Sequence, residues 1–162
     1  EEAKRGHTVA IHSASHKYNQ IYTSEQAFFD DLEQMNSIIK AQTGNDASII
    51  RFPGGSSNTV SKDYCPGIMT QLVNDVTARG LLYCDWNVSS GDANNKPIST
   101  EQVVQNVISG VQSHNVSVVL QHDIKDFSVN AVEQIIQWGQ ANGYTFLPLT
   151  TSSPMSHHRV NN

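Results

Sequence analysis

Apolar runs of strand length alternate with segments of helical periodicity along this chain, and this alternation restricts the fold more than any other feature. The strand-like runs occupy residues 7–12, 48–52, 81–86, 116–121 and 144–149. Four segments with apolar residues three and four positions apart separate these five runs. Because a helix between two strands usually brings them together in parallel, the pattern predicts an α/β protein with a parallel sheet or part of a β/α barrel.

No change of composition, low-complexity tract or linker interrupts the pattern, so we expect one domain over residues 1–162. Two of the predicted helices have a capping-box start, in which a Ser or Thr is followed three residues later by Gln. Thr23 is followed by Gln26 in this way, and Ser99 by Gln102. Each pair predicts that a helix opens there.

The charge and cysteine content of the chain narrow its classes of partner. The formal net charge is −5 and no basic cluster is longer than Lys4-Arg5, so the footprint of a nucleic-acid-binding protein is absent. No apolar run approaches the roughly 20 residues of a membrane span, and a targeting segment would lie outside this sequence. Two cysteines, Cys65 and Cys84, are too few for a disulfide framework and are expected to be unpaired.

Four of the strand-like runs end in a residue that can bind a metal or move a proton. These residues are His12 with His16, Arg51, Asp85 and His122. The loops after the carboxyl ends of parallel strands form the active-site face of β/α proteins, so one polar site is expected there. Imidazole nitrogens are ligands of zinc, but two histidines alone do not complete a catalytic zinc site.

Four segments follow one another in the order GHTVAIHSASH, RFPGGSSN, DWNVSSGDA and VVLQHD. In this order and spacing they resemble the motifs of polysaccharide deacetylases of carbohydrate esterase family 4, the NodB-homology family, and look like those of Gram-positive peptidoglycan N-acetylglucosamine deacetylases. The resemblance implies a distorted (β/α) barrel, here without its first strands. It also implies an extracellular or cell-envelope hydrolase that uses a divalent metal, with Zn²⁺ as the default, to deacetylate N-acetylglucosamine in peptidoglycan or chitin-like polysaccharide.

The resemblance gives roles to the residues at the strand ends. His12 and His16 would hold the metal ion. His122 would protonate the leaving amine, and Asp85 would be the carboxylate that favours the charged form of that imidazole. Arg51, with its planar fork of donors, would orient a catalytic aspartate.

The same resemblance places the contacts with the substrate. The backbone N–H of Gly54 would stabilise the oxyanion of amide hydrolysis. Family members often carry an aromatic residue at this position, so glycine removes one wall of the sugar groove. Trp86 and Leu120 would accept the acetyl methyl group. A turn that needs glycine, and core positions for the two apolar residues, are the structural alternatives.

One family motif is absent from the sequence, a Thr-Phe-Asp-Asp-Gly segment that supplies a catalytic base and the third metal ligand. FFDDL at residues 28–32 is similar only superficially, because it lies within a predicted helix, where Asp30 and Asp31 are expected on a solvated face. EEAKRG at the start resembles the last turn of a helix, so we expect an N-terminal truncation. The chain alone should then bind zinc weakly and be inactive.

Two alternatives to an N-acetyl hydrolase remain open at this stage. The chain is a non-catalytic glycan-binding remnant if the missing motif is absent from the natural protein. An O-acetyl esterase that acts on acetylated xylan would use the same residues as the deacetylase. In a truncated form, residues 7–12 would also offer unpaired backbone groups at a sheet edge, which favours a homodimer.

Overall fold

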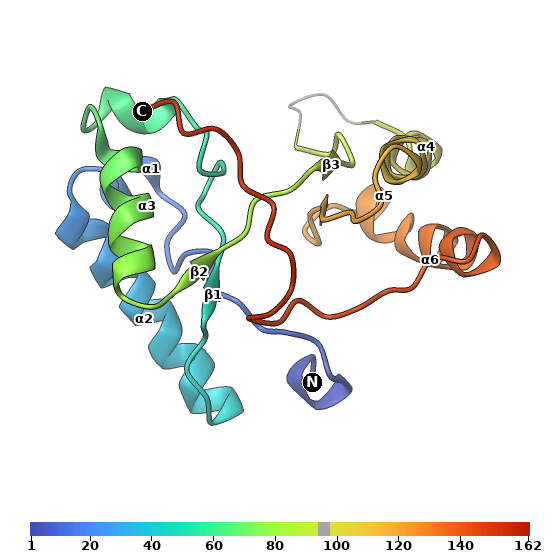
Figure 1. Ribbon diagram of the computed structural model, residues 1–162, viewed down its shortest axis with the longest axis horizontal. Helices are drawn as coiled ribbons and strands as arrows, with labels where there is room; N and C mark the ends of the chain where they lie inside the picture. Colours follow the sequence, from blue (N-terminus) through green and yellow to red (C-terminus); the bar gives the residue numbers. More distant parts are fainter. Residues whose placement is uncertain (94–97) are drawn as a thin grey trace. The chain divides into compact units, whose positions relative to one another are not determined.

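The computed structural model describes residues 1–93 and 98–162, which form two compact units. The first unit combines Glu1–Asp85 with Pro148–Asn162, and the second unit is Trp86–Leu147. In its described residues, each unit holds a two-stranded parallel sheet with helices, so the chain has a mixed α/β structure (Figure 1). No helix among the described residues is both long and apolar enough to cross a lipid bilayer.

The first unit is built around a short pair of parallel strands. In chain order it contains η1 (Ala3–Arg5), α1 (Tyr18–Ile21), α2 (Glu25–Thr43), β1 (Ile49–Ile50), η2 (Val60–Asp63), α3 (Ile68–Ala78) and β2 (Leu82–Tyr83). Ile49 of β1 lies opposite Leu82 of β2. Figure 1 shows α2 and α3 beside each other, next to this strand pair.

Helix α2 begins and ends with local signals in the sequence. Ser24 caps its N-terminus by accepting a hydrogen bond from the N–H of Ala27 at 3.1 Å. The predicted cap, Thr23, lies one residue earlier and donates its hydroxyl to the carbonyl of Gln20 instead. The helix ends at Gly44, whose φ of 81° lies in the left-handed region that glycine enters without strain.

Buried apolar side chains of α2, α3 and the strands form the core of the first unit. They include Phe28, Phe29, Leu32, Ile39, Ile50, Phe52, Ile68, Met69, Leu72 and Val76. Burying one such side chain is worth roughly 1.5–3 kcal/mol relative to leaving it in water. This core fixes the strands, and with them the loops that carry the candidate functional residues.

The segment predicted as a strand over residues 7–12 pairs with its neighbour over part of its length in the described chain. Ile11 forms a parallel bridge with Ile50, donating its N–H to the carbonyl of Ile49 at 3.0 Å and accepting from the N–H of Arg51 at 2.8 Å. His12, which follows Ile11, is the first candidate metal ligand.

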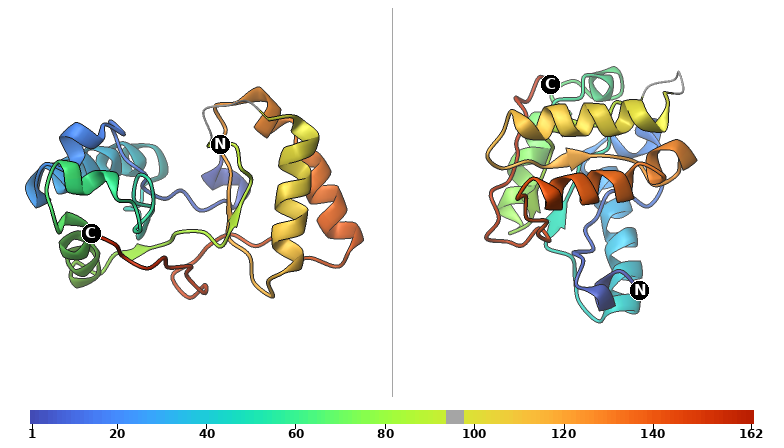
Figure 2. Two further views of the ribbon diagram at one scale, coloured as in Figure 1. Left: turned by 90° about the horizontal axis from the view of Figure 1, so that it is seen from above. Right: turned by 90° about the vertical axis from the view of Figure 1, so that its right-hand side faces the viewer.

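The second unit has the same construction on a smaller scale. It contains β3 (Val88–Ser89), α4 (Thr100–Gln112), β4 (Val119–Leu120), α5 (Asp126–Val129) and α6 (Val132–Ala141). β3 and β4 pair in parallel, with Val88 opposite Val119, and Figure 2 shows α4 and α6 beside each other. Helix α4 starts as predicted, because Ser99 accepts a hydrogen bond from the N–H of Gln102. A side chain at Gly110 would place its Cβ 2.5 Å from Val88, so the helix packs closely on β3.

Two predicted segments of the second unit differ from the structure. The polar loop predicted over residues 87–97 contains β3, and its end lies outside the described residues. The strand predicted over residues 144–149 is wrong, because this segment is irregular. Tyr144 stacks on Trp138 of α6 with ring centroids 5.3 Å apart, and Leu147 is 79% exposed, so packing on a helix replaces strand pairing here.

Candidate active-site clusters

His12 and His16 form a pair whose ring nitrogens meet. Nε2 of His12 lies 3.2 Å from Nε2 of His16, and the ring centroids are 4.9 Å apart. Nδ1 of His12 lies 2.8 Å from the carbonyl oxygen of Arg51. A carbonyl oxygen only accepts, so Nδ1 carries the proton there and Nε2 of a neutral His12 presents its lone pair toward His16.

This arrangement fits two ligands of a tetrahedral zinc ion. Zn–N distances of about 2.0–2.1 Å place two such nitrogens about 3.3 Å apart, and the pair in this chain is separated by 3.2 Å. Within residues 1–93 and 98–162, no group of three or more His, Cys, Asp or Glu side chains is placed to hold an ion. The histidine pair alone would supply two of the four ligands of such an ion.

The loop between the two histidines is held by Asp31 of α2. Its carboxylate accepts hydrogen bonds from the hydroxyl of Ser13 at 2.6 Å and from the N–H groups of Ala14 and Ser15, both at 2.9 Å. Partial burial alone would raise the pKa of Asp31, but the hydrogen bonds from Ser13 and Ser15 hold it below its ordinary value. The prediction that Asp31 is solvated is therefore wrong, whereas Asp30 is exposed as expected.

His16 adopts a backbone conformation that is uncommon for a residue with a side chain. Its φ of 55° lies in the left-handed region, and its N–H donates to the hydroxyl of Ser13 at 2.8 Å. Ser13 in turn donates to Asp31, so a chain of two hydrogen bonds fixes the backbone of His16 from α2. Such strain costs about 1–3 kcal/mol and persists where surrounding contacts determine the conformation.

The turn Pro53–Ser56 follows β1 and carries the predicted oxyanion donor. Gly54 has a φ of 78°, and a Cβ there would lie 2.5 Å from the hydroxyl oxygen of Tyr18, so Tyr18 fills the space that a side chain would need. Gly54 is exposed, and within the described chain its N–H donates no hydrogen bond. That N–H is therefore available to a ligand oxygen.

Arg51 joins the ends of the two strands of the first unit. Its Nε donates to the carbonyl of Cys84 at 3.0 Å, and one of its terminal nitrogens donates to the carbonyl of Asp85 at 3.2 Å. The guanidinium thus holds the backbone that follows β2, while the carbonyl of the same residue receives the His12 ring. Its predicted role toward a catalytic aspartate stays a prediction.

Asp85 is fully buried, and its carboxylate binds residues from distant parts of the chain. One oxygen accepts from the N–H of Ser56 at 2.8 Å. The other accepts from the hydroxyl of Ser56 at 2.5 Å and from the N–H of His158 at 2.9 Å. The C-terminal segment of the first unit is thereby fastened to the end of β2.

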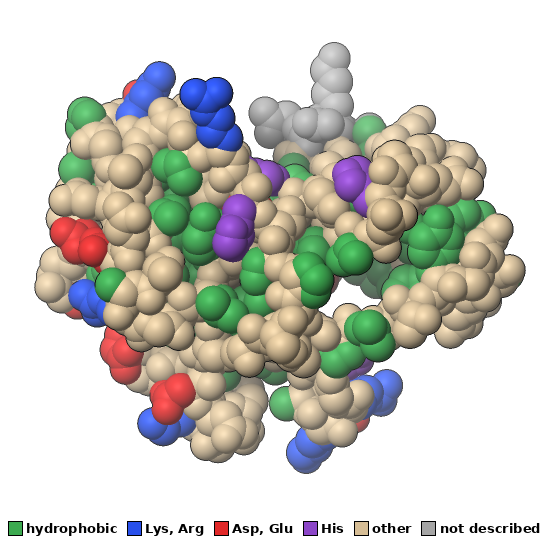
Figure 3. Space-filling view, in the orientation of Figure 1, with side chains coloured by type: hydrophobic (Ala, Val, Ile, Leu, Met, Phe, Trp, Pro, Cys, Tyr) green, Lys and Arg blue, Asp and Glu red, His purple; other side chains and the backbone are tan. Residues whose placement is uncertain are grey.

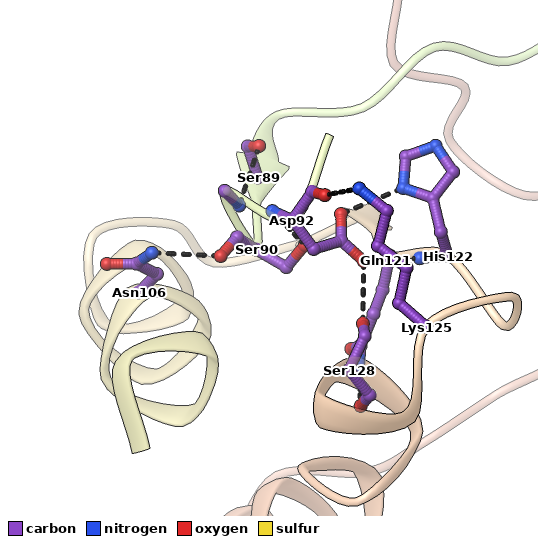
Figure 4. Close-up of polar contacts among 9 residues, drawn as sticks. Ser89, Ser90, Asp92, Asn106, Gln121, His122, Lys125 and Ser128 are labelled. Atoms are coloured by element: carbon purple, nitrogen blue, oxygen red, sulfur yellow. Dashed lines mark hydrogen bonds and ion pairs between the residues drawn. The ribbon is translucent and has the colours of Figure 1, made fainter. Parts of the chain in front are cut away.

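A second cluster lies in the second unit, where His122 follows β4 (Figure 4). Nδ1 of His122 lies 2.8 Å from one carboxylate oxygen of Asp92, and its N–H donates to the other at 2.7 Å. The hydroxyl of Ser128 also donates to Asp92, at 2.6 Å, and the Lys125 ammonium donates to its main-chain carbonyl. Because the carboxylate of Asp92 accepts from Nδ1, Nε2 of a neutral His122 carries the lone pair.

Asp92 itself is nearly inaccessible to solvent, with 1% of its side chain exposed against 35% for His122. Burial alone would raise the pKa of Asp92. Hydrogen bonds from Ser128 and His122 outweigh burial and lower the pKa from 3.8 to about 2. The N–H of Asp92 also donates to the hydroxyl of Ser90, whose carbonyl accepts from Asn106 of α4 at 2.8 Å. The sequence predicted Asp85 as the carboxylate beside His122, but the described contacts place Asp92 of the same DWNVSSGDA segment there, while the carboxylate of Asp85 binds Ser56 and His158.

The remaining predicted residues are placed as follows. Trp86 and Leu120, the predicted acetyl pocket, are both partly buried in the second unit. Leu120 pairs with Ser89 in the β3–β4 sheet. Their contact with substrate stays a prediction. Cys65 and Cys84 are free thiols, as expected.

Comparison with known proteins gives matches along nearly the whole chain. Residues 1–65 match the polysaccharide deacetylase family. One similar structure is the crystal structure of the catalytic domain of a peptidoglycan N-acetylglucosamine deacetylase from Eubacterium rectale. Its sequence identity to this chain is 99% and the TM-score is 0.99, over 99% of this chain and 73% of that one. A polysaccharide deacetylase from Bacillus cereus is 28% identical, with a TM-score of 0.80, over 96% of this chain and 73% of that one.

A curated relative is similar over a smaller share of its own length. The peptidoglycan-N-acetylglucosamine deacetylase of Bacillus cereus is 29% identical over 149 residues, which make up 90% of this chain and 51% of that protein. The chain therefore spans half the length of this relative. With these matches, the chain belongs to the polysaccharide deacetylase family, and the resemblance carried by its four ordered motifs is confirmed.

Proposed function

We propose that this chain is part of a metal-dependent hydrolase that removes acetyl groups from N-acetylglucosamine in peptidoglycan. The observation that carries the proposal is the pair of His12 and His16, whose Nε2 atoms meet at 3.2 Å while a carbonyl holds Nδ1 of His12. Similarity to peptidoglycan N-acetylglucosamine deacetylases of Eubacterium rectale and Bacillus cereus supports the choice of substrate.

In this proposal, His12 and His16 hold a divalent ion, with Zn²⁺ as the first choice for imidazole ligands. The ion would supply Lewis acidity, which polarises the acetyl carbonyl and activates water. The exposed N–H of Gly54 donates to the acetyl oxygen as negative charge develops on it. Each of these residues lies in the first unit.

Proton transfer to the leaving group is assigned to His122. Its Nε2 gives a proton to the amine nitrogen as the C–N bond breaks. Asp92 accepts from Nδ1 of the same ring and holds the tautomer in which Nε2 is the reactive nitrogen. We therefore assign to Asp92 the role of the carboxylate that orients His122. We assign the base that takes the proton of water to none of the described residues. The partly buried Trp86 and Leu120 contact the acetyl methyl group.

The proposal extends to the fold and the location of the protein. The alternation of strands and helices would belong to a distorted (β/α) barrel in a longer chain, which the two short parallel sheets support. Peptidoglycan is a polymer of the cell wall, so the enzyme would act at the cell envelope or outside the cell.

Zinc titration calorimetry on the 162-residue chain tests the metal site. We expect weak zinc binding, which His12→Ala and His16→Ala each reduce about 10-fold or more, the usual scale for disturbing a metal site. His7→Ala is the matched control, because His7 is an exposed histidine of the same segment. An equal loss of affinity in all three variants would refute the assignment.

Acetate release tests the reaction and its substrate. Acetate release is measured for the chain and for any longer form encoded by the same gene. The substrates are peptidoglycan, N-acetylglucosamine oligomers and acetylated xylan. We expect release from the first two substrates by a longer form. Release from xylan alone would favour the O-acetyl esterase. Binding of glycan without release in the longer form would favour the non-catalytic alternative.

A further inference from the structure

The carboxylate of Asp85 joins three segments of the first unit at one buried point. Asp85 itself ends the run that contains β2, Ser56 belongs to the turn after β1, and His158 belongs to the C-terminal segment. Three donors converge on two oxygens, and the residue is 0% exposed. A buried carboxylate with this many partners holds its neighbours in one arrangement, because breaking any bond leaves a buried polar group unsatisfied.

Two carbonyl groups of the Pro53–Ser56 turn also accept hydrogen bonds from side chains. The buried hydroxyl of Tyr22 donates to the carbonyl of Pro53 at 2.7 Å. The side chain of Asn58 donates to the carbonyl of Gly55 at 3.0 Å. Within this turn the N–H groups of Gly55 and Ser56 donate hydrogen bonds, whereas the exposed N–H of Gly54 donates none to any described residue.

Arg51 connects this turn to the histidine pair. Its guanidinium binds the main chain of Cys84 and Asp85, and its carbonyl accepts Nδ1 of His12. The path from His12 through Arg51 to Asp85 and on to Ser56 is thus made of hydrogen bonds within one unit. The histidine pair and the turn therefore share one rigid frame.

We propose that Asp85 is a positioning residue, which fixes the Pro53–Ser56 turn so that the Gly54 N–H keeps its place relative to His12. The inference rests on the proposed function of Gly54 as the oxyanion donor. A carboxylate is required because it offers about four lone-pair positions and no donor, whereas an amide would turn an NH₂ group toward these donors.

Amide hydrogen exchange and ¹H–¹⁵N spectra of the 162-residue chain test the inference without metal or substrate. We expect Asp85→Asn to speed exchange of the amides at positions 56 and 158 roughly 10-fold, the effect of losing one hydrogen bond. The resonance of Gly54 should shift in the same variant. Ser56→Ala, which removes the hydroxyl donor alone, should also shift it, and this variant carries the test if Asp85→Asn does not fold.

Two control variants separate positioning from other roles. Val76→Ala opens the core of α3 and lowers global stability, and it should leave the Gly54 resonance in place. Asp92→Asn should change the imidazole ¹⁵N shifts of His122, which Asp85→Asn should leave unchanged. The inference is overturned if Asp85→Asn alters the His122 ring while the turn amides stay as they were. It is also overturned if Asp85→Asn only reproduces the effects of Val76→Ala. Because no turnover is measured, neither result depends on the deacetylase proposal.

Discussion

Asp92 holds both the ring and the backbone of His122, since its two carboxylate oxygens accept from Nδ1 and from the main-chain N–H, at 2.8 and 2.7 Å. The ring cannot adopt the opposite tautomer without losing the first of these bonds. The space-filling view shows histidine side chains on this face of the molecule (Figure 3). The side chain of His122 is 35% exposed. A buried anion beneath a partly exposed imidazole suits a group that exchanges protons with a ligand.

The first prediction concerns the acid stability of this pair. Burial raises the pKa of Asp92, whereas the hydrogen bonds from Ser128 and His122 lower it. The net pKa is about 2 in place of 3.8. A carboxyl whose pKa is lower in the folded state stabilises the fold above its unfolded pKa, and this contribution is lost as the pH falls toward the folded value.

Wild-type protein should therefore be more stable than Asp92→Asn by on the order of 1–2 kcal/mol near neutral pH. The pH-dependent part of this difference should disappear between about pH 4 and pH 2. Urea unfolding of both proteins across this range measures it. A difference that stays constant from pH 7 to pH 2 would show that Asp92 does not titrate as described.

The second prediction concerns Asp31, which touches neither histidine ring but holds the loop between them. Asp31→Ala should lower zinc affinity about 10-fold or more, the usual effect of removing a group that orients metal ligands. Asp30→Ala is the matched control, because Asp30 is an exposed residue of the same helix. Calorimetric titration of both variants decides the matter, and equal affinities would show that the loop keeps its shape without Asp31.

The sequence predicted most of the alternation of strands and helices, apart from β3 and residues 144–149. It also predicted the strand ends that carry His12, Arg51, Asp85 and His122, because periodicity is set by residues close in the chain. It did not predict the partners of these residues, which come from distant segments. Both Asp85 and Asp92 lie in the DWNVSSGDA segment, and its sequence does not show which carboxylate contacts His122. Folding decides this by placing Asp92 beside Ser128 of α5.

The sequence contains a signal that separates Asp31 from Asp30. Residues three or four apart share a face of a helix, so Asp31, three positions after the buried Phe28, lies beside the apolar stripe of α2. Asp30 lies two positions after Phe28 and faces away from it. The two aspartates are adjacent in the sequence, but helical phase places them on different faces of α2.

The third prediction concerns the contact between Gly54 and Tyr18. Gly54→Ala places a Cβ 2.5 Å from the Tyr18 hydroxyl at a φ of 78°, so the variant loses stability from both strain and overlap. Gly44→Ala is the control for strain alone, because its φ is 81° and nothing lies within 4 Å of the added Cβ. We expect about 1–3 kcal/mol for Gly44→Ala and a larger loss for Gly54→Ala.

A double-mutant cycle isolates the overlap. Tyr18→Phe removes the hydroxyl oxygen, so in its presence Gly54→Ala should cost less by at least about 0.5 kcal/mol. Chemical denaturation of the two single variants and the double variant measures the coupling. Additive effects would mean that the turn moves away from Tyr18 at no cost.

The last prediction separates the metal ligand from the proton donor. In a form of the protein that releases acetate, His12→Ala should remove both bound zinc and turnover, since it deletes one of two nitrogens that meet at 3.2 Å. His122→Ala should lower turnover by roughly 10²–10⁴-fold, the usual contribution of a general acid, while zinc content stays at the wild-type level. Metal analysis and initial rates on the same preparations test both statements. If the two variants lose zinc to the same extent, His122 serves the metal, and the proton must come from another group.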